Sequence, residues 1–210
     1  QLRRSATPAT KEPQPTEPQR YRSPWGSALG WQVAMFMGLQ SIAFYTIIGW
    51  FSAFAASHGT SAQQAGFELF VYQVVAIVAN FVMVVILPRA RDQRAIALGS
   101  SLLIFIGVGG LLVQPASSLV WLTFAGLGAG SSLVLALSFF GLRSQHHHQA
   151  TLLSGMAQSV GYLLAALGPT LFGLLHDLTE GWRLPLIALL GLTVLQMLFG
   201  ALAGRSRVIS

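Results

Sequence analysis

The sequence contains no cysteine, which excludes a disulfide framework, a thiolate metal site and a cysteine nucleophile in these 210 residues. Charge is also scarce, because only 9% of the residues are charged, whereas a soluble domain carries about a quarter. Between Ser23 and Pro88 the only charged side chain is Glu68, and between Ala95 and Leu142 there is none. A soluble fold could not cover its exterior with the remaining charges. The composition therefore predicts an integral membrane protein.

The net charge of +6 does not indicate nucleic-acid binding, because the basic residues lie in short tracts between apolar runs, without interleaved aromatic residues. No cofactor and no metal site is expected. The tract His146–His148 is predicted to be a solvated loop, since consecutive side chains point in different directions. Residues 1–24 alternate five prolines with polar residues, which predicts a disordered cytoplasmic linker. Because the chain opens on Gln1 and not on Met, we expect it to be a fragment of a longer protein.

The remainder of the chain contains apolar runs long enough to cross a bilayer, which takes about 20 residues. These runs are separated by short turn-like segments, so the sequence predicts an all-α membrane protein with a six-helix bundle over residues 25–210. The six predicted spans are 27–55, 65–87, 95–113, 119–142, 152–175 and 184–202.

The distribution of Lys and Arg predicts the orientation of these spans. If the N-terminal segment is cytoplasmic, eleven of the twelve basic residues lie on that side and only Arg183 lies on the other. The protein is therefore expected in the inner membrane, with both ends of the chain in the cytoplasm. The eleven are Arg3, Arg4, Lys11, Arg20, Arg22, Arg89, Arg91, Arg94, Arg143, Arg205 and Arg207.

Two long motifs carry a family resemblance. Residues 31–41, with the sequence WQVAMFMGLQS, continue to Tyr45 and Trp50 and resemble the seventh helix of the CynX/NimT (cyanate and 2-nitroimidazole) porters. Residues 153–166, followed by Gly168 and Pro169, resemble their eleventh helix. These porters belong to the major facilitator superfamily. The resemblance implies that the chain is the C-terminal half of a twelve-helix transporter and that its partner is the N-terminal six-helix half.

The first span carries a polar row. Gln40 and Phe44 are spaced four apart, with Ser41 and Tyr45 on the adjoining row, so they share one helical face. Polar side chains inside a span face a partner helix or a watery cavity. Both readings fit, but facilitator folds line their cavity with the first and fourth helices of each half, and this favours the second. Gln158 and Tyr162 in the fifth span form a similar face and are also predicted to line the cavity.

The fourth span contains Gly126, Gly128 and Gly130, which predict close helix packing or a hinge, since no strand precedes them as in a phosphate-binding loop. The superfamily repeats a short basic cytoplasmic loop, and its place is taken here by Arg89, Arg91, Asp92 and Arg94. Pro88 stands at a position where the superfamily has a glycine.

Glu68 is the only carboxylate predicted inside a span. It is a candidate for proton coupling, although it lies close enough to the outer end of its helix to reach water. Gln73 and Asn80, seven residues apart on the same helix, are expected to face the bundle.

These observations predict a non-enzymatic secondary transporter that moves a small polar or anionic solute by alternating access. A six-span intramembrane protease of the rhomboid type is one alternative, because it needs a Gly-x-Ser pattern in the fourth span and Gly130, Ser131 and Ser132 provide one. The sixth span, however, has no histidine to act as the base. A channel is another alternative, and the sequence shows no charged or carbonyl-rich filter segment.

Overall fold

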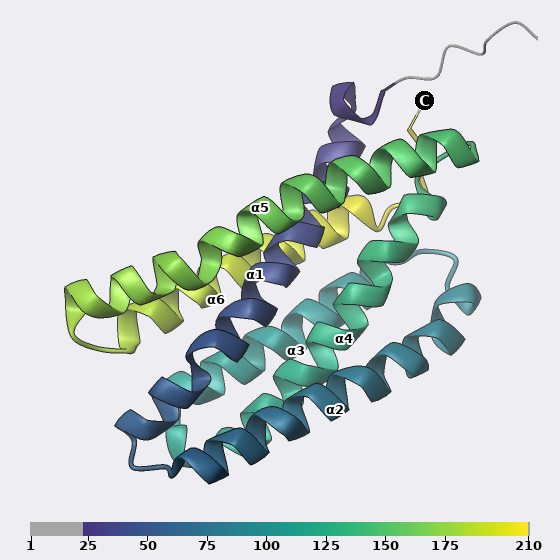
Figure 1. Ribbon diagram of the computed structural model, residues 1–210. Coiled ribbons are helices and arrows are strands. Elements are labelled where there is room, and N and C mark those ends of the chain that lie inside the picture. Colours follow the sequence, from purple (N-terminus) through teal and green to yellow (C-terminus); the bar gives the residue numbers. More distant parts are fainter. Residues whose placement is uncertain (1–22, 210) are drawn as a thin grey trace, which may run out of the picture.

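The computed structural model describes residues 23–209, which form a bundle of six long helices without a β-strand (Figure 1). Each of the six is long and apolar enough to cross a bilayer, which confirms the predicted spans. The helices are α1 (Ala28–Ser57), α2 (Ala62–Ile86), α3 (Arg94–Val113), α4 (Ser118–Leu142), α5 (His147–Thr179) and α6 (Arg183–Ala203). Three short 3₁₀ helices are η1 (Pro24–Gly26), η2 (Leu87–Arg89) and η3 (Pro115–Ser117). The predicted linker over residues 1–24 lies outside the described residues except at its last two positions.

Helix α5 is longer than its apolar run. It begins at His147, five residues before the predicted start, so His147 and His148 lie on its first turn and not in a loop. Backbone hydrogen bonding along a helix does not depend on apolar side chains, and hydropathy therefore misses a polar first turn. Helix α5 ends where Glu180 adopts a left-handed backbone conformation, with a φ of 48°.

The helix contacts repeat when α1, α2 and α3 are exchanged for α4, α5 and α6. Helix α1 packs on α5 and α6, and in the same way its counterpart α4 packs on α2 and α3. Because the helices alternate in direction, the two three-helix units run in opposite senses through the bundle (Figure 1). Inverted three-helix repeats are typical of each half of a major facilitator transporter.

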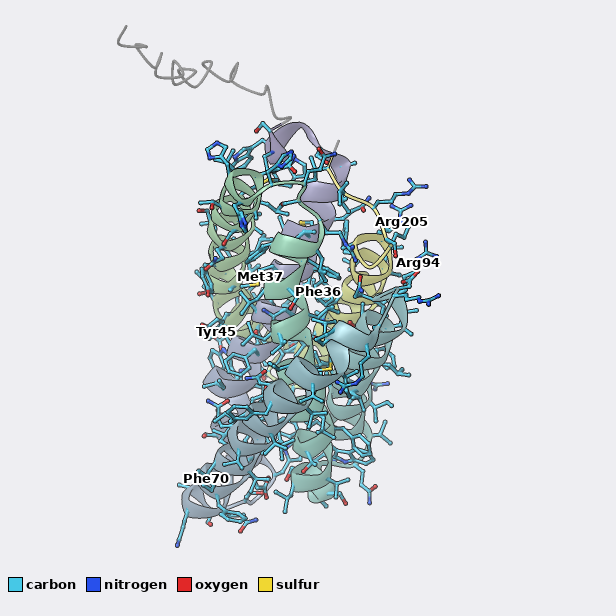
Figure 2. The ribbon with its side chains drawn as sticks, turned by 90° about the vertical axis from the view of Figure 1, so that its right-hand side faces the viewer. Phe36, Met37, Tyr45, Phe70, Arg94 and Arg205 are labelled. Atoms are coloured by element: carbon cyan, nitrogen blue, oxygen red, sulfur yellow. The ribbon has the colours of Figure 1, made fainter. Side chains whose placement is uncertain are left out.

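Burial is uneven among the helices. Helix α1 is central and contributes residues to both core clusters. Helices α2 and α5 instead leave broad apolar faces uncovered, exemplified by Phe70, which is 63% exposed and lies at the periphery of the bundle (Figure 2). Such faces are stable only against lipid or against other apolar helices.

Most of the basic side chains lie at one end of the bundle. Within residues 23–209, the basic side chains Arg89, Arg91, Arg94, Arg143, Arg205 and Arg207 all lie at or beyond the helix ends near the start of α1, whereas Arg183 begins α6 at the opposite end. Figure 2 shows Arg94 and Arg205 together at that first end and Phe70 toward the other.

Candidate functional site

A cavity of about 240 Å³ lies among α1, α2, α4 and α5. Its volume is slightly below the range of about 300–1,000 Å³ that is typical of sites for drug-sized ligands. Its walls contain neutral polar groups and apolar surface but no Asp, Glu, Lys, Arg or His. The lining residues are Met37, Gln40, Ser41, Phe44, Tyr45, Gln73, Ala76, Ile77, Asn80, Ala129, Gly130, Leu133 and Tyr162.

Helix α1 supplies the buried polar wall. The Gln40 amide donates to the Ser41 hydroxyl at 2.7 Å, and that hydroxyl donates to the Met37 carbonyl oxygen at 2.8 Å. Gln40 and Ser41 are each only 3% exposed. The Ser41 proton and the Gln40 amide N–H groups, which also approach the Met37 sulfur at 3.6 Å, are therefore already used within α1. This leaves the amide oxygen of Gln40 as the more available partner for a bound solute.

Aromatic side chains cover the rest of this wall. The ring of Phe44 meets Tyr45 edge-on at 5.3 Å between centroids and lies 5.9 Å from the ring of Tyr72 on α2. Tyr45 and Tyr162 are 44% and 48% exposed, so they form the open rim of the cavity. Figure 2 shows Met37 and Tyr45 along the same helix, with Tyr45 nearer the outside of the bundle.

Gln158 is the one predicted cavity residue that does not line this cavity. Its side-chain amide donates to the Ser154 hydroxyl at 2.7 Å, so the side chain runs back along α5. One turn further, Tyr162 occupies the place at the cavity rim. Sequence spacing puts both residues on one face, but they are one turn apart along α5 and only Tyr162 lies beside the cavity.

Helix α2 contributes Gln73 and Asn80, which the sequence suggested only as residues facing the bundle. Together with Ala76 and Ile77 they follow the spacing i, i+3, i+4 and i+7, which is one helical face. The available signal was two amide side chains seven residues apart in an otherwise apolar span. The Asn80 side-chain oxygen is shielded from solvent and has no hydrogen-bond partner within residues 23–209.

The three α4 glycines predicted to serve packing or a hinge, Gly126, Gly128 and Gly130, lie at close contacts between helices. A Cβ atom on Gly126 would stand 2.7 Å from the Tyr72 carbonyl oxygen of α2, and one on Gly130 would overlap the Ala76 carbonyl oxygen. A Cβ atom on Gly128 would overlap the Ser100 carbonyl oxygen of α3. The absence of side chains here lets α4 approach both neighbours closely.

Glu68 does not reach water, although its position near the end of the helix would have allowed this. It is 4% exposed, and it is the only buried carboxyl group within residues 23–209. One carboxyl oxygen accepts from the Gln64 amide at 2.9 Å, and the other accepts from the Ser118 hydroxyl at 2.6 Å. Since Ser118 is the first residue of α4, Glu68 connects α2 to α4.

The predicted basic loop lies between α2 and α3, and its charges are exposed. Asp92 accepts from the Arg94 backbone N–H at 2.8 Å and pairs with its guanidinium at 3.6 Å. A pair of this kind, half exposed on both sides, contributes little to stability. Arg89 donates to the Val85 carbonyl oxygen, and the Arg91 carbonyl oxygen accepts from Ser206.

Arg143 is buried behind this loop, and sequence reasoning assigned it no role beyond the charge bias. Its guanidinium donates to the carbonyl oxygens of Ala203 at 2.7 Å and Gly204 at 3.2 Å, and to the Gln93 side chain. It also lies 5.0 Å above the ring of Phe139. Burial lowers the pKa of Arg143, and the nearby charge of Asp92 partly raises it. Arg143 thereby joins the ends of α3, α4 and α6.

Ser132, next to the Gly130–Ser131 pair that suggested a protease, is also buried. It accepts from the Gln196 amide of α6 at 3.1 Å. An amide is no general base, so this pairing gives the serine no means of activation.

The known proteins that resemble the chain are named as transporters. No family model matches the chain. The chain is 43% identical over 188 residues to the 2-nitroimidazole transporter of Escherichia coli K12, covering 90% of the chain and 48% of that protein. It is 40% identical over 187 residues to the uncharacterized transporter YycB of Bacillus subtilis 168, covering 88% and 46%. It is 24% identical over 174 residues to the cyanate transport protein CynX of Escherichia coli K12, covering 80% and 45%. The chain thus spans about half the length of these curated relatives.

Proposed function

We propose that this chain, a relative of the 2-nitroimidazole and cyanate transporters, is the second six-helix half of a secondary transporter for small polar or anionic solutes. The observation that carries the proposal is the shape of the polar cavity. It lies inside a six-helix bundle of inverted repeats, and its rim residues Tyr45 and Tyr162 are half exposed. A complementary half placed over this rim would close the cavity around a solute.

The mechanism that fits this architecture is alternating access, in which two six-helix halves rock around a central site. The uncovered apolar faces of α2 and α5 flank the cavity and would pack against the partner half and the lipid. Because six basic residues of the described part lie at one end, we place that end, and with it both termini, in the cytoplasm beneath an inner membrane. Transport requires no covalent chemistry, so we infer that the protein is not an enzyme.

The solute-binding residues of this half would be Gln40, Ser41, Phe44, Tyr45 and Tyr162. Gln40 would hydrogen-bond the solute from the buried wall, while the aromatic rings of Phe44 and the two tyrosines would hold its flat faces. Since no basic side chain lines the cavity, any fixed positive charge for an anion must come from the partner half. Gln158, outside the cavity lining, would act only in a conformation in which α5 has shifted.

Gln40→Ala is expected to reduce uptake of 2-nitroimidazole by the complete transporter in proteoliposomes by about tenfold, because a lost hydrogen bond of about 1.4 kcal/mol corresponds to that factor. Gln158→Ala is expected to retain uptake within about twofold of wild type. The two variants are a matched pair, since both remove an amide from the polar face of a span. Wild-type kinetics in Gln40→Ala would refute the assignment of this cavity.

We further propose that Glu68 carries the proton in a proton-coupled cycle. Its neighbour Ser118 has a hydroxyl group, which can donate to a carboxylate or accept from a protonated carboxyl group. The pair can therefore hold both protonation states of Glu68, and a change of state would alter the contact between α2 and α4. A buried ionisable residue within a span is by default a candidate for such a role.

Glu68→Gln is expected to abolish the response of transport to an imposed pH gradient while solute exchange continues, because the amide keeps the shape of the carboxyl group but does not titrate. The assay is solute uptake in proteoliposomes with and without the gradient. Glu180→Gln, which changes an exposed carboxyl group, is the control and should respond as wild type does. An unchanged response in Glu68→Gln would exclude Glu68 as the coupling group.

A further inference from the structure

One residue that lines the polar cavity has a solvent-shielded hydrogen-bonding atom without a partner in the described part of the chain. Asn80 lines the cavity from α2, and its side-chain oxygen has almost no solvent-exposed area and no hydrogen-bond partner within residues 23–209. A buried acceptor without a donor is unfavourable. Six side-chain atoms of the described residues are buried without a partner, and the Asn80 oxygen is the one among them whose residue lines this cavity. Since buried polar atoms are usually paired, a donor brought into the cavity would satisfy it.

The neighbours of Asn80 do not supply that donor. Toward α4, the cavity wall beside Asn80 is formed by Ala129, Gly130 and Leu133, none of which has a polar side chain. Across the cavity on α1, the hydroxyl proton of Ser41 is engaged by the Met37 carbonyl oxygen, and Gln40 donates to Ser41. Gln40 and Ser41 of α1 are thus paired with each other and with Met37. The other donors of the lining, on Gln73, Tyr45 and Tyr162, make no hydrogen bond to the Asn80 oxygen.

We propose that Asn80 is a specificity-determining residue of this cavity, whose amide oxygen accepts a hydrogen bond from an N–H or O–H group of the transported solute. This inference rests on the proposed transport function and names the class of solute. The solute is small and planar, it carries at least one hydrogen-bond donor on its edge, and it is neutral or singly charged. Flat faces suit Phe44 and the tyrosine rim, while the donor points to α2.

A site built around a hydrogen-bonding partner discriminates strongly against an analogue that lacks the matching group, because the protein atom is then left buried and unpaired. A solute in which the donor N–H is replaced by N–CH₃ should therefore bind poorly. The added methyl group would also approach the Asn80 oxygen closely, which increases the penalty.

The test uses 2-nitroimidazole and 1-methyl-2-nitroimidazole, a pair that differs only at this nitrogen, at mildly acidic pH, where the ring nitrogen keeps its proton. Uptake of each is measured in proteoliposomes containing the complete transporter. Wild type is expected to prefer the N–H compound by about tenfold. Asn80→Leu keeps the branched shape of the side chain but has no acceptor, and it should reduce this preference to about twofold or less. Val78→Leu, an exposed position outside the cavity, should keep the preference of wild type.

A second measurement tests the position of Asn80 independently of transport. Because residues 1–210 contain no cysteine, Asn80→Cys introduces the only thiol in this half. It should react with a small polar thiol reagent faster than Ala79→Cys, whose position is buried at 4% exposure and does not line the cavity, and 2-nitroimidazole should slow the reaction.

The outcomes separate the two proposals. Equal uptake of both compounds by wild type, a preference that persists in Asn80→Leu, or equal thiol reactivity at positions 79 and 80 would overturn the role of Asn80 while leaving the transport function intact. If folded wild type carries neither compound, the proposed function fails for this class of solute, and the role of Asn80 fails with it.

Discussion

Gly128→Leu is expected to abolish the folded, membrane-inserted form of the protein. Already the first side-chain atom at this position would overlap the Ser100 carbonyl oxygen and stand 2.7 Å from the Ile104 side chain of α3. A backbone carbonyl cannot move aside without shifting its whole helix, and Ile104 is itself only 1% exposed. The substitution therefore separates α3 from α4, which form one of the most extensive helix contacts in the bundle. The measurement is the yield of monodisperse protein in detergent.

The matched control is Gly99→Leu on α3, since a Cβ atom at Gly99 would meet nothing within 4 Å. Near-normal yield is expected there. If the leucine variant cannot be purified, the two alanine variants at the same positions test the same contact. Gly128→Ala should lower the free energy of unfolding by about 1–3 kcal/mol, as overpacking does. Gly99→Ala should raise it by about 0.5–1 kcal/mol, because alanine favours a helix over glycine. The same sign of change for both alanine variants would contradict the close packing at Gly128.

Arg143→Ala is expected to destabilise the protein by about 3 kcal/mol or more. The substitution leaves two buried acceptors without a donor, the Gln93 side-chain oxygen and the Ala203 carbonyl oxygen. It also removes one of the two donors to the Gly204 carbonyl oxygen, which still accepts from the Gln93 N–H, and the contact with the Phe139 ring, worth about 1 kcal/mol. Each unsatisfied acceptor costs at least about 1 kcal/mol. The C-terminal tail should loosen as well, because the Ile209 N–H donates to the Arg143 carbonyl oxygen at 2.9 Å and this contact depends on the position of Arg143. Thermal unfolding in detergent measures the effect, and the expected decrease in Tm is roughly 10 °C.

Two further variants separate the geometry of Arg143 from its charge. Arg143→Lys keeps the positive charge but presents a single ammonium group, which cannot reach acceptors on three helix ends at once, so an intermediate Tm is expected. Arg207→Ala removes an exposed basic residue from the same end of the bundle and should leave Tm near that of wild type. A lysine variant as stable as wild type would show that only the charge of Arg143 matters and would contradict the proposed junction of α3, α4 and α6.

The candidate cavity was partly accessible from the sequence. Gln40, Ser41, Phe44 and Tyr45 all lie on one helix, and their common face follows from the helical period alone. The structure places them along one wall, as that period requires. The predictions for Gln158 and Asn80 differ from the structure in opposite ways. Gln158 was predicted to line the cavity and does not, whereas Asn80 was not assigned to the site and lines it.

The physical reason is that a helical period determines which residues share a face but not which neighbour that face meets. The position of α5 on α1 is set by close contacts at glycines. A Cβ atom on Gly161 would stand 3.0 Å from the Met37 side chain, and one on Gly168 would stand 2.8 Å from that of Ile42. These contacts involve residues more than a hundred positions apart. They hold α5 so that Tyr162, and not Gln158, reaches the cavity.

The sequence by itself determined that the protein crosses the membrane six times and how its charges are divided between the two ends. Both properties follow from the bilayer, which requires about 20 apolar residues per span and leaves charges at the ends of the helices. Only the tertiary structure decided which polar groups meet. Gln93 and Arg143 are 50 residues apart, as are Glu68 and Ser118. Their pairing depends on which helices pack together and at what rotation, and that is set by close contacts between backbones that no local pattern encodes.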